Sequence, residues 1–271
     1  MKTPDADASF EVIAGDPMSR VVIHVPHSST VIPAWVRDHI LLTDQELVRE
    51  LAFMTDARTD EIACAAADNA TVRPWIFLNR RSRLVVDPER FPDPADEPMA
   101  APEIGMGAVY TRTAHGGILR DDDAAHHEAL LDRYFRPYAT ALTQLVEERL
   151  AALGQVTIID LHSYPLVALP YEQLHHPDAA RPECCIGVDP THTPPALKDA
   201  ASAAFATLGE VGVNEPFAGT YVPLAFYIEG DTRVTSVMVE LRRDTYLEAE
   251  NGMPMVTGML TTLIDTVDAQ P

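Results

Sequence analysis

The amino-acid sequence predicts a single α/β domain, and three observations lead to this prediction. Short apolar runs rich in β-branched residues alternate along the chain with longer segments of helical periodicity. The chain has 271 residues and is 46% hydrophobic, which is enough for one large core. No internal repeat or low-complexity tract divides it. We therefore expect one domain over residues 1–271, in which residues 1–18 are an extension or a mobile N-terminus.

The first predicted strand covers Val21–Val25 and ends where Pro26 begins a polar turn. Residues 43–68 then show helical periodicity, in one piece or in two. Thr43 and Thr55 are the candidate N-caps, because a threonine hydroxyl can accept a hydrogen bond from the first turn of a helix. The chain therefore begins with a strand followed by helix.

A second strand is predicted over Thr71–Leu78, although Pro74 shortens it or confines it to an edge. Residues 91–107 are rich in Pro, Asp and Glu, which predicts a loop within the domain. A long helix follows over residues 123–153, and Pro137 predicts a kink or break in it because proline cannot donate the helical hydrogen bond.

The clearest buried strand is Val156–Leu161, which follows Gly154 as a helix C-cap and leads into His162. Further strand candidates are Cys184–Val188, Glu210–Val213 and Val234–Leu241. Ligands of open α/β sheets bind at the carboxyl ends of the strands, so residues directly after these runs are the first candidates for a functional site.

Composition and charge exclude several classes of protein. The formal net charge is −21, from 41 acidic and 20 basic residues, which argues against binding to nucleic acid or to anionic membranes. The sequence has no run of about 18 apolar residues and no apolar stretch typical of a signal peptide near its start. Its three cysteines form no CxxC motif, so we expect a reduced, cytoplasmic setting.

Three polar residues lie at predicted strand ends, namely His27, His162 and Glu240. Any one of them could be a structural polar residue, but their shared location predicts a site. Two histidines and a carboxylate form a catalytic zinc set that leaves one position open for water. The candidate carboxylates include Asp56 and Asp60, which lie four residues apart on one helix face; a negatively charged helix start is the other interpretation.

Arginines gather in two places although the chain is acidic. One cluster contains Asn79, Arg80 and Arg83, and the other is Arg242 followed by Arg243. Such runs are often solvated surface. At a strand end, however, a guanidinium fork suits a carboxylate, so the clusters predict a small anionic substrate.

Six motifs, in this order, resemble those of the N-formylglutamate amidohydrolase family. They are Val25-Pro26-His27-Ser28-Ser29, Thr55-Asp56-x-x-Thr59-Asp60-Glu61, Asn79-Arg80, Ile159-Asp160-Leu161-His162-Ser163, Asn214-x-Pro216-x-x-Gly219 and Val239-Glu240-Leu241-Arg242-Arg243-Asp244-x-Tyr246. The resemblance implies a three-layer mixed sheet with helices on both faces, similar to zinc carboxypeptidases (phosphorylase/hydrolase-like). It also implies hydrolysis of N-formylglutamate to glutamate and formate.

The resemblance further implies a role for each site residue. His27, Asp56 and His162 would hold one Zn²⁺, although Asp60 or Glu61 could be the carboxylate ligand instead, and Glu240 would act as general base beside His162. The residues expected to bind the substrate are Asn79, Arg80, Arg83, Arg242, Tyr164 and Asn214. Arg243 is an alternative to Arg242, and for Tyr164 and Asn214 a structural hydrogen bond is the other interpretation.

The chain departs from the family at Ala57-Arg58, where members acting in histidine breakdown often carry aromatic residues, and at Ser28-Ser29. The substrate could therefore be another acyl amino acid, and a non-catalytic dicarboxylate-binding protein is a further hypothesis. No Gly-x-Ser-x-Gly motif supports a nucleophilic serine. His24 lies inside the first strand, and we expect it to be buried rather than a ligand. The sequence leaves open whether the protein is a monomer or a homo-oligomer.

Overall fold

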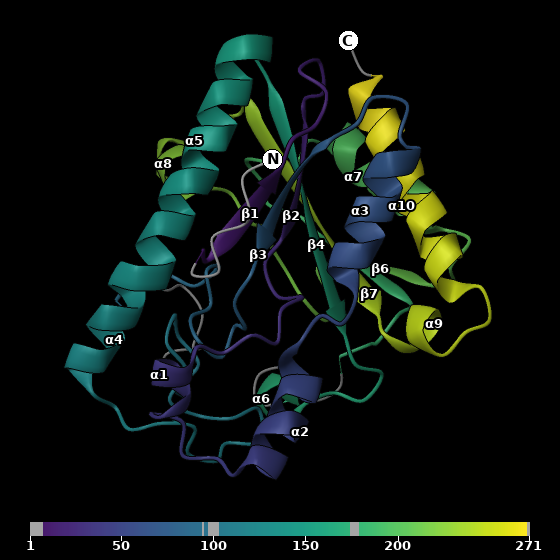
Figure 1. Cartoon of the computed structure of the whole chain (residues 1–271). Helices are drawn as coiled ribbons and strands as arrows, with labels where there is room; N and C mark the ends of the chain where they lie inside the picture. Colours follow the sequence, from purple (N-terminus) through teal and green to yellow (C-terminus); the bar gives the residue numbers. More distant parts are fainter. Residues whose placement is uncertain (1–7, 94, 97–102, 174–178, 270–271) are drawn as a thin grey trace.

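Seven strands form one mixed sheet in the order β1-β3-β2-β4-β7-β5-β6 (Figure 1). The computed structural model describes residues 8–93, 95–96, 103–173 and 179–269. The strands are β1 (Phe10–Ile13), β2 (Val21–Val25), β3 (Trp75–Asn79), β4 (Val156–Tyr164), β5 (Cys184–Gly187), β6 (Val211–Val213) and β7 (Val234–Arg242). The predicted α/β class with a mixed sheet is confirmed.

The inner strands of the sheet run in one direction. β4 pairs in parallel with β2 and with β7, and β2 pairs in parallel with β3. Towards the edges, β1 runs antiparallel to β3, and β5 runs antiparallel to β7 while pairing in parallel with β6. The carboxyl ends of β3, β2, β4 and β7 therefore meet at one edge of the sheet, which is where ligands bind in such folds.

Every strand predicted from the sequence is present, with small shifts at its ends. β3 begins directly after Pro74, so the proline shortens a strand that lies inside the sheet between β1 and β2. β4 continues through Tyr164, which places His162 within the strand rather than beyond it.

β1 was not predicted, because residues 10–13 fall in the segment expected to be an extension. This strand has only four residues and no fully buried side chain, which explains its weak sequence signal. Phe10 nevertheless stacks on Phe77 of β3 with ring centroids 5.2 Å apart. Residues 10–13 of the predicted extension therefore belong to the fold, while residues 1–7 lie outside the described part of the chain.

Helices cover both faces of the sheet, as predicted. On one face α3 (Thr59–Asn69), α7 (Pro195–Phe205) and α10 (Gly252–Asp268) bury apolar side chains against the inner strands. On the other face α5 (Arg136–Leu153) packs on the sheet together with α8 (Leu224–Glu229). Figure 1 shows the sheet between these two layers.

The long helix predicted over residues 123–153 is interrupted as expected near Pro137. It consists of α4 (Ala124–Leu130), a π-helical turn η1 (Leu131–Phe135) and α5. Pro137 lies in the first turn of α5, where its missing N–H costs least, and the wider π turn precedes it.

The helical segment over residues 43–68 forms two pieces. Thr43 caps α2 (Asp44–Met54), accepting a hydrogen bond from the Glu46 N–H while the Glu46 carboxylate accepts one from the Thr43 N–H. Thr55 is not the cap of the second piece; α3 follows Arg58, which has a left-handed backbone with φ 65°. The break between the two helices therefore contains Asp56.

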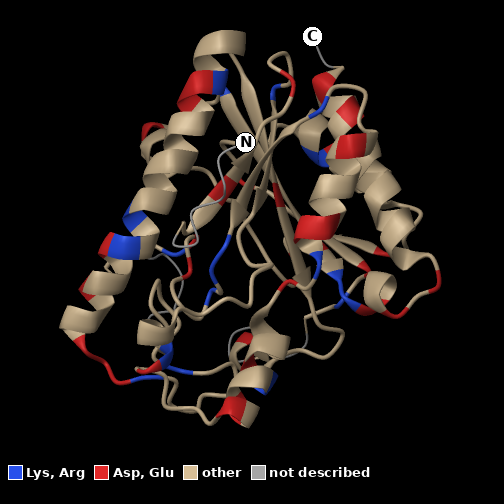
Figure 2. Ribbon diagram, in the orientation of Figure 1, with Lys and Arg blue, Asp and Glu red and all other residues tan. Residues whose placement is uncertain are grey.

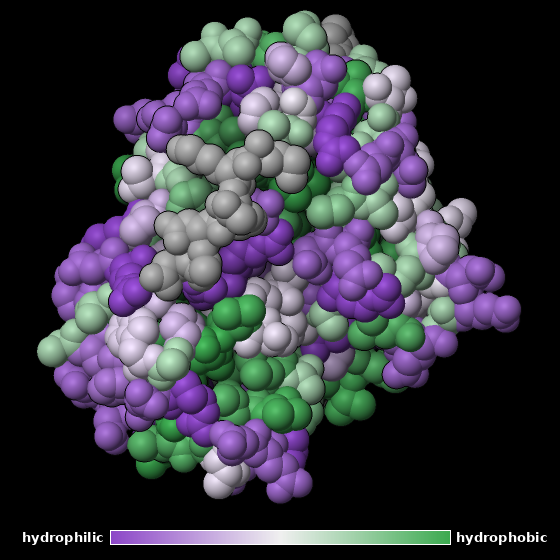
Figure 3. All heavy atoms as spheres, viewed as in Figure 1, coloured by the Kyte–Doolittle hydropathy of each residue, from purple (hydrophilic) through white to green (hydrophobic). Residues whose placement is uncertain are grey.

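Loops and short helices cover the carboxyl edge of the sheet, namely α1 (Ala34–Arg37), α2, α6 (Pro170–Gln173) and α9 (Asp244–Leu247). Apolar side chains are exposed here, among them Leu41 at 56% and Val48 at 67%, and Figure 3 shows apolar groups on this part of the surface. Acidic residues are spread over the helices on both sides of the sheet (Figure 2). Within the described residues, no helix is both long and apolar enough to cross a membrane.

Candidate metal centre

The residues predicted at strand ends meet at the carboxyl edge of the sheet. His162 on β4 and Glu240 on β7 are direct neighbours in the register of the two parallel strands. His27 follows β2, the strand on the other side of β4. All three side chains are buried, with Glu240 the most exposed at 7%. The sheet topology thus brings together residues that are more than 200 positions apart in sequence.

Three of the predicted ligands face one another with the spacing of a metal site. His27 Nδ1 lies 3.3 Å from His162 Nδ1, and Asp56 Oδ2 lies 3.2 Å from His162 Nδ1 and 3.6 Å from His27 Nδ1. Tetrahedral zinc with bonds of about 2.0–2.1 Å separates its ligand atoms by about 3.3–3.4 Å. The three atoms therefore have the spacing of three ligands on one zinc ion.

The break between α2 and α3 positions Asp56. Its N–H donates to the carbonyl oxygen of His27, and its own carbonyl accepts a hydrogen bond from the Thr59 hydroxyl. Of the alternative carboxylates, Glu61 is exposed and pairs with Arg58, and Asp60 contacts neither His27 nor His162 in the described structure. Of the three predicted carboxylates, Asp56 is therefore the one that the fold brings to the histidines.

Further carboxylates lie beside the outer nitrogens of the two rings. His27 Nε2 lies 2.9 Å from Asp87 Oδ1, and the other oxygen of Asp87 accepts a hydrogen bond from Arg83 Nη2 at 2.7 Å. His162 Nε2 lies 3.1 Å from Asp160 Oδ1. Carboxylates in this position orient metal-ligating histidines and leave the other ring nitrogen, here Nδ1, available for the metal.

Negative charge dominates the cluster and shifts the pKa values of its members. Burial lowers the pKa of His162, but the nearby carboxylates of Glu89 and Asp160 outweigh this and raise it well above its usual value. Burial raises the pKa of Glu240 to about 8, although His162 opposes the shift. Glu240 Oε2 is buried without a hydrogen-bond partner. A buried cluster of this charge favours a bound cation.

Arg243 supports the metal cluster. Its Nη2 lies 3.3 Å from Asp56 Oδ1, and its Nε donates to the hydroxyl of Ser163 at 3.2 Å. A further hydrogen bond of 2.8 Å reaches the carbonyl oxygen of Phe53 at the end of α2. Arg243 was predicted only as an alternative to Arg242, but its contacts orient Asp56.

Two of the predicted substrate-binding arginines form ion pairs within the chain. Arg80 pairs with Glu11 of β1, and Arg242 pairs with Glu183 and Asp244. Their predicted role in substrate binding stays a prediction. Arg83 lies closer to the metal cluster, because its guanidinium contacts Asp87 and acts electrostatically on Glu240.

The predicted polar lining residues all make hydrogen bonds to the backbone. Asn79 Nδ2 donates to the carbonyl oxygen of Pro26, which fixes the turn before His27. The Tyr164 hydroxyl donates to the carbonyl oxygen of Pro182. Asn214 has a left-handed backbone with φ 56°, and its Oδ1 accepts a hydrogen bond from the Val188 N–H. Their contribution to the pocket stays a prediction.

No role was predicted for Asp87, Glu89 or Asp160 from the sequence. Asp160 could have been found, because it lies two residues before His162 on the same strand and therefore on the same face. Asp87 and Glu89 lie in an irregular segment after β3, where no periodicity indicates their direction. His24 is fully buried, as expected, with Nε2 2.6 Å from the Tyr138 hydroxyl.

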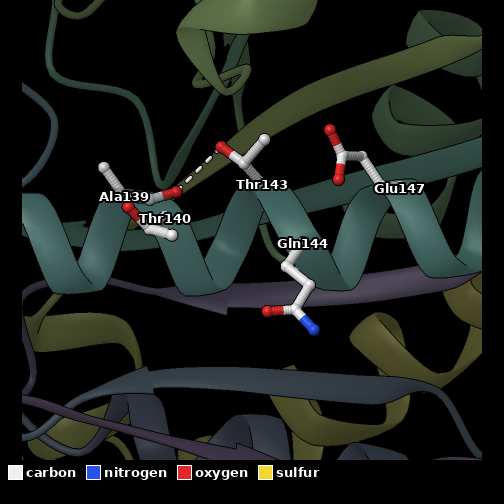
Figure 4. A pocket seen from close by; sticks show the side chains of 5 residues that line it. All are labelled: Ala139, Thr140, Thr143, Gln144 and Glu147. Atoms are coloured by element: carbon white, nitrogen blue, oxygen red, sulfur yellow. Dashed lines mark hydrogen bonds between the residues drawn. The ribbon is translucent and has the colours of Figure 1, made fainter.

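Two surface depressions lie away from this cluster. One, of about 470 Å³, is lined by Ala139, Thr140, Thr143, Gln144 and Glu147, all on the outer side of α5 (Figure 4). Thr143 donates its hydroxyl to the Ala139 carbonyl of the same helix. The other is lined by Phe91, Asp96, Asp189, Thr191, His192, Tyr227 and Ile228. Neither contains a residue of the histidine–carboxylate cluster.

The sequence model of the N-formylglutamate amidohydrolase family matches residues 19–247, most of the chain. The chain belongs to the N-formylglutamate amidohydrolase family. It is thus an amidohydrolase, and every residue of the metal cluster lies within the matched segment. No curated protein matches the chain.

Solved structures agree in fold with this assignment to the N-formylglutamate amidohydrolase family. An N-formylglutamate amidohydrolase from Ralstonia eutropha JMP134 aligns with a TM-score of 0.76 at 23% identity, over 96% of this chain and 97% of that one. A gene product from Agrobacterium tumefaciens aligns with a TM-score of 0.68 at 20% identity, over 96% and 94% of the two chains. At these identities the alignments show that the fold is shared across almost the whole length.

Proposed function

We propose that this protein hydrolyses the amide bond of a small acidic N-acyl amino acid, with N-formylglutamate as the expected substrate and glutamate and formate as products. We further propose that His27, Asp56 and His162 bind one Zn²⁺ for this reaction. One observation carries the proposal: His27 Nδ1, His162 Nδ1 and Asp56 Oδ2 lie 3.2–3.6 Å apart beside Glu240. Two imidazoles and one carboxylate are a ligand set of catalytic zinc, with a fourth position for water.

The residues present fit a divalent cation. The cluster combines buried carboxylates with two histidines, and Asp87 holds the outer nitrogen of His27. His162 Nε2 and Glu240 Oε2 are buried without a hydrogen-bond partner. A bound Zn²⁺ would polarise the amide carbonyl, lower the pKa of a bound water towards about 7 and favour the ionised form of Glu240 through its charge.

Glu240 is the proposed proton carrier. As a carboxylate it accepts the proton of the attacking water, and it then donates that proton to the amine nitrogen that leaves. Its buried position excludes bulk water from this transfer, and Asp56 and His162 fix the point at which the water attacks. The same carboxyl therefore acts first as a base and then as an acid.

Positive side chains near the cluster would bind the carboxylates of the substrate. Arg83 is the best placed of the predicted set, because its guanidinium contacts Asp87, the carboxylate that holds His27 Nε2. Asn79, Arg80, Arg242, Tyr164 and Asn214 complete the proposed set, as expected from the resemblance. Binding of the remote carboxylate would orient the amide for attack.

A second candidate differs only in the acyl amino acid. Because Arg80 and Arg242 already pair with acidic residues of the chain, a substrate with a single carboxylate needs no rearrangement of these ion pairs. We place either reaction in the cytoplasm, which the three free cysteines support.

Metal analysis followed by a substrate panel tests the proposal. The panel contains formyl-, acetyl- and peptidyl-glutamate together with formyl-leucine, each measured before and after treatment with a chelator. We expect metal-dependent release of formate, fastest from formylglutamate. Faster turnover of formyl-leucine would support the second candidate, and hydrolysis that survives complete metal removal would contradict the proposed mechanism.

A further inference from the structure

A second group of ligand atoms lies on the far side of the His162 ring. Its members are His24 Nδ1, Glu89 Oε1, Asp160 Oδ1 and His162 Nε2. The first three belong to residues whose ligand atoms all lie within 4.8 Å of one another. Asp56 and the Nδ1 atom of His162 face the first site, so this second group uses the nitrogen of His162 that the first site leaves unused.

The spacing within this group is that of ligands on one metal ion. Asp160 Oδ1 lies 2.9 Å from His24 Nδ1 and 3.1 Å from His162 Nε2. Glu89 Oε1 lies 3.6 Å from His24 Nδ1 and 3.3 Å from His162 Nε2. These distances bracket the separation of about 3.3–3.4 Å that tetrahedral zinc imposes on nitrogen and oxygen ligands.

Two atoms of this group are buried without a hydrogen-bond partner. They are Glu89 Oε1 and His162 Nε2, and the His162 side chain is only 5% exposed. Such orphaned atoms are costly in a protein interior unless an ion or another group satisfies them. The two atoms lie 3.3 Å apart, so a single ion would satisfy both.

Neighbouring groups orient the other two ligands towards the same point. His24 Nε2 lies 2.6 Å from the Tyr138 hydroxyl, which leaves Nδ1 to face Asp160. The N–H of Tyr221 donates to Asp160 Oδ2 at 3.1 Å, which leaves Oδ1 for the group. Outer hydrogen bonds of this kind support metal ligands in proteins.

We propose that His24, Glu89, Asp160 and His162 Nε2 form a second zinc site, and that the His162 ring bridges it to the catalytic site. The bridge rests on the proposed function, since the first site supplies the metal at Nδ1. Binding of a metal at each ring nitrogen would require His162 Nε2 to lose its proton to solvent. Two histidine nitrogens and two carboxylate oxygens are ligands that Zn²⁺ accepts.

The metal content of purified protein, reconstituted with Zn²⁺ and dialysed, tests the second site. We expect two equivalents in the wild-type protein and one in Glu89→Gln, which keeps the size of the side chain. His24→Asn provides a second variant with the same expected loss, and circular dichroism confirms that each variant is folded. Glu61→Gln is the matched control and keeps two equivalents, because Glu61 is exposed on α3 and pairs with Arg58.

A third variant, Asp56→Asn, separates the two proposals. If the wild-type protein binds one equivalent of Zn²⁺, and Asp56→Asn loses it while Glu89→Gln keeps it, the second site is overturned and the proposed function stands. If the wild-type protein binds one equivalent of Zn²⁺, and Glu89→Gln loses it while Asp56→Asn keeps it, the second site is supported and the proposed catalytic site is overturned. If the wild-type protein binds two equivalents of Zn²⁺ and each variant binds one, both proposed sites are supported.

Discussion

Two pairs of contacting histidines lie in the described part of the chain, and their surroundings differ. The rings of His27 and His162 have centroids 5.1 Å apart and are tilted by 55°, whereas those of His39 and His126 stack at 3.9 Å and 17°. Carboxylates surround the first pair and raise the pKa of His162 well above its usual value. Burial, helped by the charge of His39, lowers the pKa of His126 to about 4.

The comparison indicates which feature distinguishes the candidate metal site. Both pairs include a buried Nε2 without a hydrogen-bond partner, at His162 and at His126. Ring contact and an orphaned nitrogen are therefore not sufficient. Of the two pairs, only His27 and His162 have carboxylates as neighbours that could be further ligands, such as Asp56, and a carboxylate, Asp87, that holds an outer ring nitrogen.

Metal removal gives the largest expected difference between the two pairs. Chelation of the purified protein should abolish amide hydrolysis, and Zn²⁺ should restore it, because the attacking water depends on the ion held at His27 and His162. The environment of His126 should not change, which the His126 ring signals in NMR spectra can show. If amide hydrolysis persists in protein that contains no detectable metal, the proposed difference between the two histidine pairs is wrong.

Glu240→Gln should lower kcat by about 10²–10⁴, the usual contribution of a general base. The metal should remain bound, because Glu240 is not a ligand in the proposed site. Steady-state kinetics and metal analysis of the same preparation check the two halves of this prediction. A variant with normal kcat would exclude Glu240 as the proton carrier.

Asp87→Asn should weaken metal binding by about 10–100-fold, the usual effect of changing an outer partner of a metal ligand. The variant replaces the carboxylate that lies 2.9 Å from His27 Nε2 with a neutral amide. Competition with a fluorescent zinc chelator measures the affinity. Asp231→Asn is the control, since Asp231 pairs with Arg233 away from the cluster; equal affinities in the two variants would argue against a role for Asp87.

The smallest effect concerns acid stability at His126. Because its pKa in the folded protein is about 4, below the usual 6.5, the unfolded chain binds more protons between these values, and stability falls as pH drops from about 6.5 to 4. His126→Gln should remove this part of the acid loss, a change of a few degrees in Tm at most. Thermal unfolding at pH 7 and pH 5 measures it, and an unchanged difference between the two pH values would contradict the lowered pKa.

Local patterns were sufficient to predict every strand except β1, and the residues at the ends of the predicted strands. β2, β4 and β7 are apolar runs with clear ends, so His27, His162 and Glu240 could be placed at one edge of the sheet from the sequence alone. Asp56 could be preferred to Asp60 because it lies nearer the loop end of the predicted helix, where a metal at the strand ends would lie.

The remaining features depend on tertiary contacts that no local pattern specifies. Asp87 and Glu89 follow an irregular segment, and their approach to the histidines is decided by how that segment packs over the sheet edge. The partners of Arg80 and Arg242 are equally non-local: Glu11 belongs to the unpredicted strand β1, and Glu183 precedes β5. Sequence reasoning could identify these arginines as important but not determine what they bind.

A crystal structure of the Zn²⁺-loaded protein, with anomalous difference maps recorded on both sides of the zinc absorption edge, tests the central claim most directly. The account predicts a zinc peak about 2.0–2.1 Å from His27 Nδ1, His162 Nδ1 and the carboxylate of Asp56. An anomalous difference map of the Zn²⁺-loaded protein with no zinc peak between these three atoms would contradict the account.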